Sequence, residues 1–282
     1  MRLQTLARRT YWGTAAWQDQ ALATKRAAST TMGAPTSLAP VSLDTLQSLS
    51  SFRPGIAYVL DSLYLAPTAR SPAKNTMRSC RGAEFTKKDA GLAPLPASRA
   101  AKTTASDSGF EPLPANAEEP SAAEFNDLVR DWIAATGSGR VVIQGEGDPL
   151  AAADVVVETL SLAQGSGAKF RLNTLGQTPV TAETVWPRRG GYLAEAVDAA
   201  LPLVEAVSVF LPAADAETYD ALLQPRDPGA FDDACAFVKR ASMVMNVEVT
   251  AVDRPDVDVA QVEALAKSLG AAQFRTRSWL GD

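Results

Sequence analysis

The chain has 282 residues, of which 46% are hydrophobic and 21% are charged, and its formal net charge is −5. This charge balance lacks the basic footprint of a nucleic-acid-binding protein, and no apolar run is long enough to span a bilayer. Histidine is absent, which excludes Ser-His-Asp and Cys-His catalysis, and the two cysteines, Cys80 and Cys235, are too few for a disulfide framework. We therefore expect a soluble protein whose partner is a small molecule, with neither nucleic acid nor a membrane bound.

Residues 1–50 are predicted to form a disordered N-terminal extension. The segment is rich in Ala, Ser and Thr, contains five basic residues, and has no acidic residue other than Asp19 before Asp44. This composition is typical of an organellar transit peptide, which would direct the protein to a mitochondrion or plastid. An extension that targets nothing, on a cytoplasmic protein, is the alternative, and the sequence leaves both open.

Residues 51–282 are predicted to form one α/β domain. Its first strand is expected at Ile56–Leu65, and a Pro-, Ala- and Ser-rich insertion follows over residues 66–120. This insertion contains an imperfect duplication, GLAPLPAS at 91–98 and GFEPLPAN at 109–116, which favours extended surface loops over a proline-rich ligand for a partner protein.

Strands and helices alternate after the insertion. A helix is expected between a capping box at Ser121 and Glu124 and a glycine stop at Gly137. It leads into the strand RVVI at 140–143, which ends in the glycine-rich turn GEGDP. Further strands are predicted at 169–174, 206–211, 247–252 and 273–280, with helices near 152–164, 193–203, 215–242 and 258–269. Such an alternation indicates a parallel sheet, and Cys235 is expected to be a buried structural thiol on an apolar helix face.

The two faces of the later strands differ in polarity. A flat sheet covered by helices on both sides should be apolar on both faces, so one polar face favours a partial barrel with a polar interior that binds a ligand. On this face we expect Glu248 to pair with Arg275 or Arg277. We also expect the turn at Gly145–Pro149 to form the floor of the main pocket. The residues assigned to the polar face are Arg171, Asn173, Ser208, Phe210, Glu248, Thr250, Arg275 and Arg277.

Six segments occur in an order and spacing that resemble a known family. They are LYLAPTARSPAKNTMRSC, GEGDPL, FRLNTLGQ, VSVFLPAADAETYDALLQP, VTAVDRPDVD and FRTRSWLG. Over about Ile56 to Gly281 the chain resembles the radical S-adenosylmethionine (SAM) superfamily, most closely the TatD-associated radical SAM proteins. The resemblance implies a partial (β/α)6 barrel of the TIM type. It also implies that a four-iron four-sulfur (4Fe-4S) cluster, held by three cysteines after the first strand, reductively cleaves SAM.

The resemblance also implies binding roles for particular residues. The turn after the second strand would hold the methionine amino group of SAM through its backbone, and later strands would line the ribose, the methionine moiety, the adenosine or a substrate. The positions that match are Gly145, Gly147, Asp148 and Pro149 in the turn, Asn173 and Ser208 at the ribose and methionine, and Thr250, Arg275 and Arg277 at the adenosine or substrate.

The cluster loop departs from the family pattern. Ser71 stands where the first cysteine is expected, the second position falls near Met77, and only Cys80 remains. One thiolate cannot replace three, so we expect no stable cluster, with Ser71 and Met77 close to Cys80 and beside the Gly145 turn. Three functions stay open. They are a radical SAM enzyme with an unusual cluster, a pseudoenzyme that binds SAM or a nucleoside, and an unrelated barrel enzyme that uses Glu248, Asp148 and the arginines on an anionic small molecule.

Overall fold

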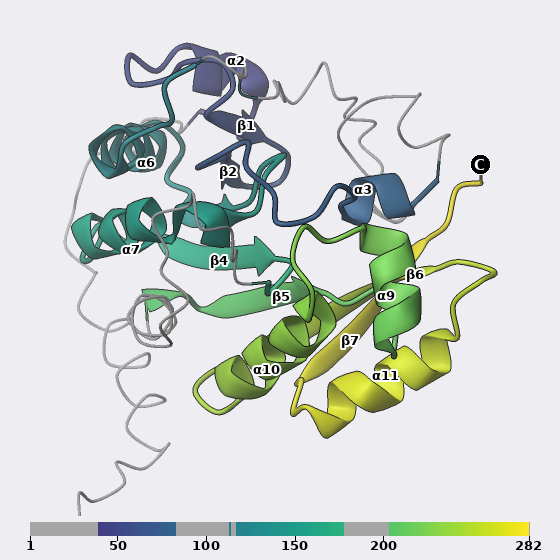
Figure 1. Cartoon of the computed structure of the whole chain (residues 1–282). Coiled ribbons are helices and arrows are strands. Elements are labelled where there is room, and N and C mark those ends of the chain that lie inside the picture. Colours follow the sequence, from purple (N-terminus) through teal and green to yellow (C-terminus); the bar gives the residue numbers. More distant parts are fainter. Residues whose placement is uncertain (1–38, 83–112, 114–116, 178–202, 282) are drawn as a thin grey trace, which may run out of the picture. The chain divides into compact units, whose positions relative to one another are not determined.

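The computed structural model of the chain describes residues 39–82, 113, 117–177 and 203–281 (Figure 1). Residues 1–38, almost all of the duplicated PLP segments and the helix expected near 193–203 lie outside the described residues, so the predictions on them stay predictions. Among the described helices, none is long and apolar enough to traverse a bilayer.

A short helix lies within the segment that the sequence assigned to the N-terminal extension. Helix α2 spans Leu43–Gln47, and the Ser42 hydroxyl accepts a hydrogen bond from the Thr45 N–H at 3.2 Å. Leu46 in this helix is fully buried. One compact unit covers Ala39–Asp282, so α2 belongs with the sheet.

In the described part of the chain, seven strands form one sheet in the order β1-β2-β3-β4-β5-β6-β7. The single strand predicted at Ile56–Leu65 is wrong in detail, because two short antiparallel strands form a hairpin there. Its polar turn contains Asp61 and Ser62, and the Leu60 N–H donates to the Ser62 carbonyl at 3.2 Å. All later pairings are parallel. The strands are β1 (Ala57–Val59), β2 (Leu63–Leu65), β3 (Arg140–Ile143), β4 (Lys169–Thr174), β5 (Ala206–Phe210), β6 (Val247–Asp253) and β7 (Gln273–Ser278).

The strand order has the form of a barrel that does not close. A doubly wound sheet reverses its order at a switch point, whereas each parallel strand here lies beside its predecessor in the chain. Tyr64 on β2 and Arg277 on β7 nevertheless interact electrostatically. In a flat sheet five strand spacings would separate them by roughly 24 Å. The sheet therefore curves around its polar face, as the predicted α/β partial barrel requires.

Helices cover the outer face of the sheet and bury its apolar side chains (Figure 1). Helix α6 begins at the Ser121–Glu124 capping box and ends at Gly137, which has φ 66°, as predicted. Val207, Val249 and Trp132 are fully buried in the resulting core. The described helices of this part of the chain are α6 (Ala122–Thr136), α7 (Ala153–Leu162), α9 (Ala216–Leu223), α10 (Ala230–Ser242) and α11 (Val259–Ser268), with the short helices η2 (Pro149–Ala152) and α3 (Met77–Cys80).

Cys235 lies on α10 and packs against this core, but its side chain is half-buried rather than fully buried. Burial, followed by the charge of Asp232, raises the pKa of the Cys235 thiol to about 11. Cys235 therefore packs against the core as expected, but its side chain is more exposed than predicted.

Candidate functional site

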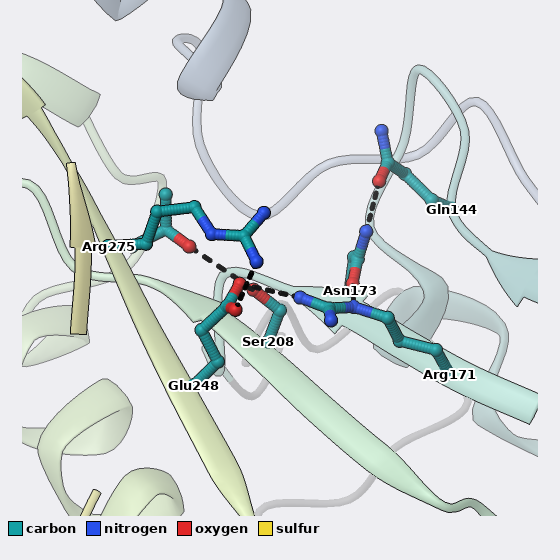
Figure 2. A network of polar contacts seen from close by, with 7 residues as sticks. Gln144, Arg171, Asn173, Ser208, Glu248 and Arg275 are labelled. Carbon is teal, nitrogen blue, oxygen red and sulfur yellow. Dashed lines mark hydrogen bonds and ion pairs between the residues drawn. The ribbon is translucent and has the colours of Figure 1, made fainter. Parts of the chain in front are cut away.

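A buried carboxylate joins two arginines on the inner face of the sheet (Figure 2). Glu248 on β6 is 6% exposed, and its two oxygens accept from Arg275 Nη2 at 2.7 Å and from Arg171 Nη2 at 2.6 Å. The Ser208 hydroxyl lies 3.2 Å from the same carboxylate and donates to it. The predicted pair of Glu248 with Arg275 is confirmed, and the inward facing of these strands is confirmed with it.

Hydrogen bonds extend this network along the inner face toward β3. Arg171 Nε donates to Asn173 Oδ1 at 2.9 Å, and the Asn173 amide donates to Gln144 Oε1. On the other side, the hydroxyls of Ser208 and Thr250 lie 3.2 Å apart. Four of the residues predicted to line a ligand site thus belong to one connected network. They are Asn173, Ser208 and Arg275, which Figure 2 shows, and Thr250 through its contact with Ser208.

Two members of the network were missing from the predicted site. Arg171 lies two residues before Asn173, so the alternation of β4 already placed it on the polar face. Gln144 directly follows the strand RVVI, at the carboxyl end of β3. In both cases the position of the residue on its strand is the signal that could have found it.

Positive charge exceeds negative charge in this network. Three arginines, Arg171, Arg275 and Arg277, interact with the single carboxylate of Glu248, which leaves a net charge of +2. Burial, followed by the charge of Arg275, lowers the pKa of Arg277. The side chains of Arg171 and Arg275 are 31% and 47% exposed, so solvent and solutes reach them.

The predicted glycine turn packs tightly against the segment that follows β2. A Cβ added at Gly147 would lie 2.5 Å from the Thr68 carbonyl oxygen and closer still to that of Arg70, and one at Gly145 would lie 2.7 Å from Ala66 Cβ. Such separations are shorter than van der Waals contact, so only glycine fits at these two positions. The glycines therefore permit close approach of two backbone segments of the chain itself.

Asp148 connects this turn to the end of β4. Its buried carboxylate accepts from the Leu150 N–H at 2.9 Å, from the Thr174 hydroxyl at 2.7 Å and from the Leu175 N–H at 2.6 Å. Burial raises the pKa of Asp148, and these hydrogen bonds oppose the shift. Pro149 begins the short helix η2. A role of Gly145, Gly147, Asp148 and Pro149 in binding a cofactor stays a prediction.

The segment after β2 that contains Ser71, Met77 and Cys80 contacts the carboxyl ends of several parallel strands. Arg78 on α3 forms an ion pair with Glu146 in the glycine turn at 3.1 Å, which places α3 beside that turn as predicted. Arg254, just after β6, donates to the Cys80 carbonyl at 3.2 Å. Arg81 Nε donates to the Ser278 carbonyl at the end of β7 at 3.0 Å.

The residues of this loop do not fit an iron–sulfur cluster. Cys80 is buried, its thiol lies 3.8 Å from the Leu222 carbonyl, and burial raises its pKa to about 11, which opposes the thiolate that iron needs. Ser71 lies farther back in the loop, where its carbonyl accepts from Arg226 Nε at 3.0 Å, while Met77 shares α3 with Cys80. Within the described part of the chain, no group of three or more His, Cys, Asp or Glu side chains is arranged to hold a metal ion.

Two hollows in the described part of the chain lie away from the glycine turn. One of about 170 Å³ is lined by Asn75, Ser79, Cys80, Ala221, Leu222 and Arg254. Another small hollow lies in the apolar packing around Leu65, Phe125 and Thr159. Neither hollow has Gly145–Pro149 in its lining, and a pocket floored by this turn stays a prediction.

Comparisons with known proteins identify no family. No family model matches the chain, and no curated protein matches it. Structures of SuiB from Streptococcus suis, alone and bound to S-adenosylmethionine, are 14% identical with a TM-score of 0.43 and cover 58% of this chain. The match spans only 35% to 36% of SuiB. A sugar phosphate isomerase/epimerase from Parabacteroides distasonis is 10% identical with a TM-score of 0.34, over 57% of this chain and 58% of that one. Likenesses of this size carry no argument about function.

Proposed function

We propose that this chain is a radical-SAM-like barrel that has lost the cluster chemistry and binds an anionic small molecule on the inner face of its sheet. The observation that supports the proposal is the group of three arginines, Arg171, Arg275 and Arg277, around the one carboxylate of Glu248. Barrels bind their ligands at the carboxyl ends of their strands, and Gln144, Asn173 and Arg277 lie toward those ends, next to the Glu248 carboxylate deeper on the inner face.

An anion would be stabilised here more than in water. Hydrogen bonds between guanidinium groups and oxyanions are charge-assisted, and each contributes about 1.5–3 kcal/mol when it is shielded from solvent. Glu248 neutralises one of three positive charges, so the remaining two favour a ligand with one or two negative charges. The partial exposure of Arg171 and Arg275 leaves a path to the site.

The same contacts support binding rather than catalysis. Asp148, a candidate acid or base, is buried and bonded to three groups of the chain itself. Glu248 is likewise occupied by two arginines and a serine. A proton-transfer role would require one of these carboxylates to leave its partners.

SAM itself is a second candidate ligand. Three uncharged hydrogen-bonding side chains, Asn173, Ser208 and Thr250, lie at positions that match SAM-lining positions in the family resemblance. The sulfonium group of SAM is positive, however, and the nearby arginines disfavour it. Negative charge on a ligand should therefore strengthen binding if the site binds anions, whereas the positive sulfonium of SAM should weaken it.

Thermal unfolding with a panel of ligands tests the proposal. Glucose 6-phosphate should raise the melting temperature in a concentration-dependent way, because a ligand at about 100 times its Kd stabilises by about 2.7 kcal/mol. Glucose should have no effect, and added salt should weaken the effect of the phosphate. Equal stabilisation by glucose, or stabilisation by SAM alone, would contradict anion binding.

A matched pair of arginine variants adds specificity to that test. Arg275→Ala removes a guanidinium of the network, and Arg130→Ala removes one from the exposed surface of α6, where the Arg130 side chain is 63% exposed. The shift caused by glucose 6-phosphate should shrink in the first variant and persist in the second. A shift that is equal in both variants would place the anion outside the network.

A further inference from the structure

The three inner-face arginines differ in how their donors are used. Arg171 and Arg275 each direct one terminal nitrogen at Glu248. Arg277 makes no such ion pair with a described residue, and its Nε is buried without a hydrogen-bond partner among the described residues. A buried donor without an acceptor is destabilising, so a group that supplies the acceptor gains that interaction on binding.

A second unsatisfied donor lies two residues further along. The indole Nε1 of Trp279 is also buried, again with no acceptor within the described part of the chain. Residues two apart in an extended strand share a side, and Trp279 directly follows the end of β7. Guanidinium and indole nitrogens only donate, so the missing partner must be an acceptor, as the oxygens of an anion are.

The surroundings of Arg277 also favour a bound anion. Arg81 bonds to the carbonyl of Ser278, the neighbour of Arg277, so a second guanidinium lies close by. Burial lowers the pKa of Arg81, and the charge of Arg277 lowers it further. An anion at Arg277 would relieve this repulsion, and the loop that contains Arg81 would shield it from solvent.

We infer that Arg277, with the Trp279 indole N–H, binds the oxyanion of the ligand at the carboxyl end of β7, while the Glu248-paired arginines Arg171 and Arg275 form the adjoining wall. The inference rests on the proposed function and names the chemical group that the site recognises. The ligand class is a small molecule that carries a phosphate or carboxylate group. The oxygens of this group accept from the two buried donors, and its body lies toward Asn173 and Ser208.

Isothermal titration calorimetry on the full chain tests the assignment with three probes. Glucose 6-phosphate supplies a phosphate ester, gluconate a carboxylate on a similar body, and inorganic phosphate the oxyanion alone. Tighter binding of the first probe than of the others identifies a phosphate ester, and tighter binding of gluconate identifies a carboxylate. Either result supports an oxyanion site.

Four variants locate the site. Against the tightest probe, Arg277→Ala should weaken binding about 30-fold or more, and Trp279→Phe, which keeps the ring but removes the N–H, about 5-fold. Arg277→Lys keeps the charge but loses the planar set of donors, so about 10-fold weaker binding is expected. Arg130→Ala on the surface of α6 should bind as the natural chain does.

The outcomes separate this inference from the proposed function. If the natural chain binds none of the three probes, the proposed function fails. If the natural chain binds a probe and the Arg277 and Trp279 variants bind it within twofold as tightly, only the assignment to the end of β7 fails. Since Arg277→Ala removes a half-buried side chain, Arg277→Lys and Trp279→Phe decide the matter if that variant does not fold.

Discussion

Glu248 on β6 accepts from Arg275 on β7 at 2.7 Å and from Arg171 on β4 at 2.6 Å. One carboxylate therefore links β6 to its neighbour β7 and, across β5, to β4. The link is possible because β5 alone separates β4 from β6, a distance of roughly 10 Å that the long Arg171 side chain and Glu248 bridge on the same face of the sheet. Glu248 therefore connects β4, β6 and β7 at the centre of the proposed ligand site.

Removal of this carboxylate should destabilise the fold. Glu248→Ala leaves Arg171 and Arg275 without their counter-charge, and breaking a buried pair costs about 3–5 kcal/mol. Because both arginines are partly exposed, we expect the lower end, about 3 kcal/mol, in the free energy of unfolding measured with urea.

A carboxylate in an exposed ion pair, Glu205, provides the control for Glu248. Glu205 precedes β5 and pairs with Lys169 on β4 at 3.2 Å, but both side chains are more than half exposed. Glu205→Ala should cost less than about 1 kcal/mol, as exposed pairs do. Equal losses in the two variants would mean that Glu248 is not the central counter-charge of the inner face.

Glycine at position 147 should be required for steric reasons. Gly147→Ala places a methyl group against the Thr68 and Arg70 carbonyls, and overpacking of this kind costs about 1–3 kcal/mol. Gly165→Ala is the contrast, since Gly165 has φ +77° but open space around it, and should cost about 1 kcal/mol through conformation alone. Urea unfolding of both variants measures the difference, and an equal or smaller loss at Gly147 would contradict the close approach.

Asp148 should make stability depend on pH in a defined direction. Burial raises its pKa in the folded state above the value of about 3.9 in the unfolded chain. The folded protein then binds a proton more readily, so this contribution is full below the unfolded pKa and is lost as the pH rises through the folded pKa. Relative to Asp148→Asn, the natural chain should gain stability as the pH falls from 7 toward 4. A difference that is constant, or that shrinks on acidification, would contradict a raised pKa.

The cluster loop should bind negligible iron. Only Cys80 remains of three expected cysteines, and its pKa of about 11 keeps the thiol protonated at neutral pH. Iron and sulfide assays after anaerobic reconstitution of the natural chain should give background values. The double variant Ser71→Cys and Met77→Cys should recover some of each if the loop keeps the geometry of the family. Full cluster content and SAM cleavage by the natural chain would overturn the proposed loss of cluster chemistry.

The parts of the structure that local sequence determines could be predicted well. The limits of α6 follow from Ser121, Glu124 and Gly137, whose capping preferences act within one turn. The facing of Glu248 and Arg275 follows from strand alternation, which has a period of two residues. These features require no knowledge of distant contacts.

Features that depend on distant contacts could not be predicted. The glycines at 145 and 147 suggested a ligand-binding turn, but the turn contacts Ala66 and Thr68–Arg70, more than seventy residues earlier. The pairing of Arg171 with Glu248 spans 77 residues and depends on the order of the strands in the sheet, which the pattern within one strand does not specify. The unsatisfied donors of Arg277 and Trp279 likewise emerge only from packing.

A crystal structure of the protein grown with glucose 6-phosphate tests the central claim most directly. Anion binding on the inner face predicts phosphate oxygens within hydrogen-bond distance of Arg277, with the sugar beside the network of Arg171, Glu248 and Arg275. A phosphate bound on the outer helical layer, or in the cavity between Asn75 and Arg254, would contradict the claim.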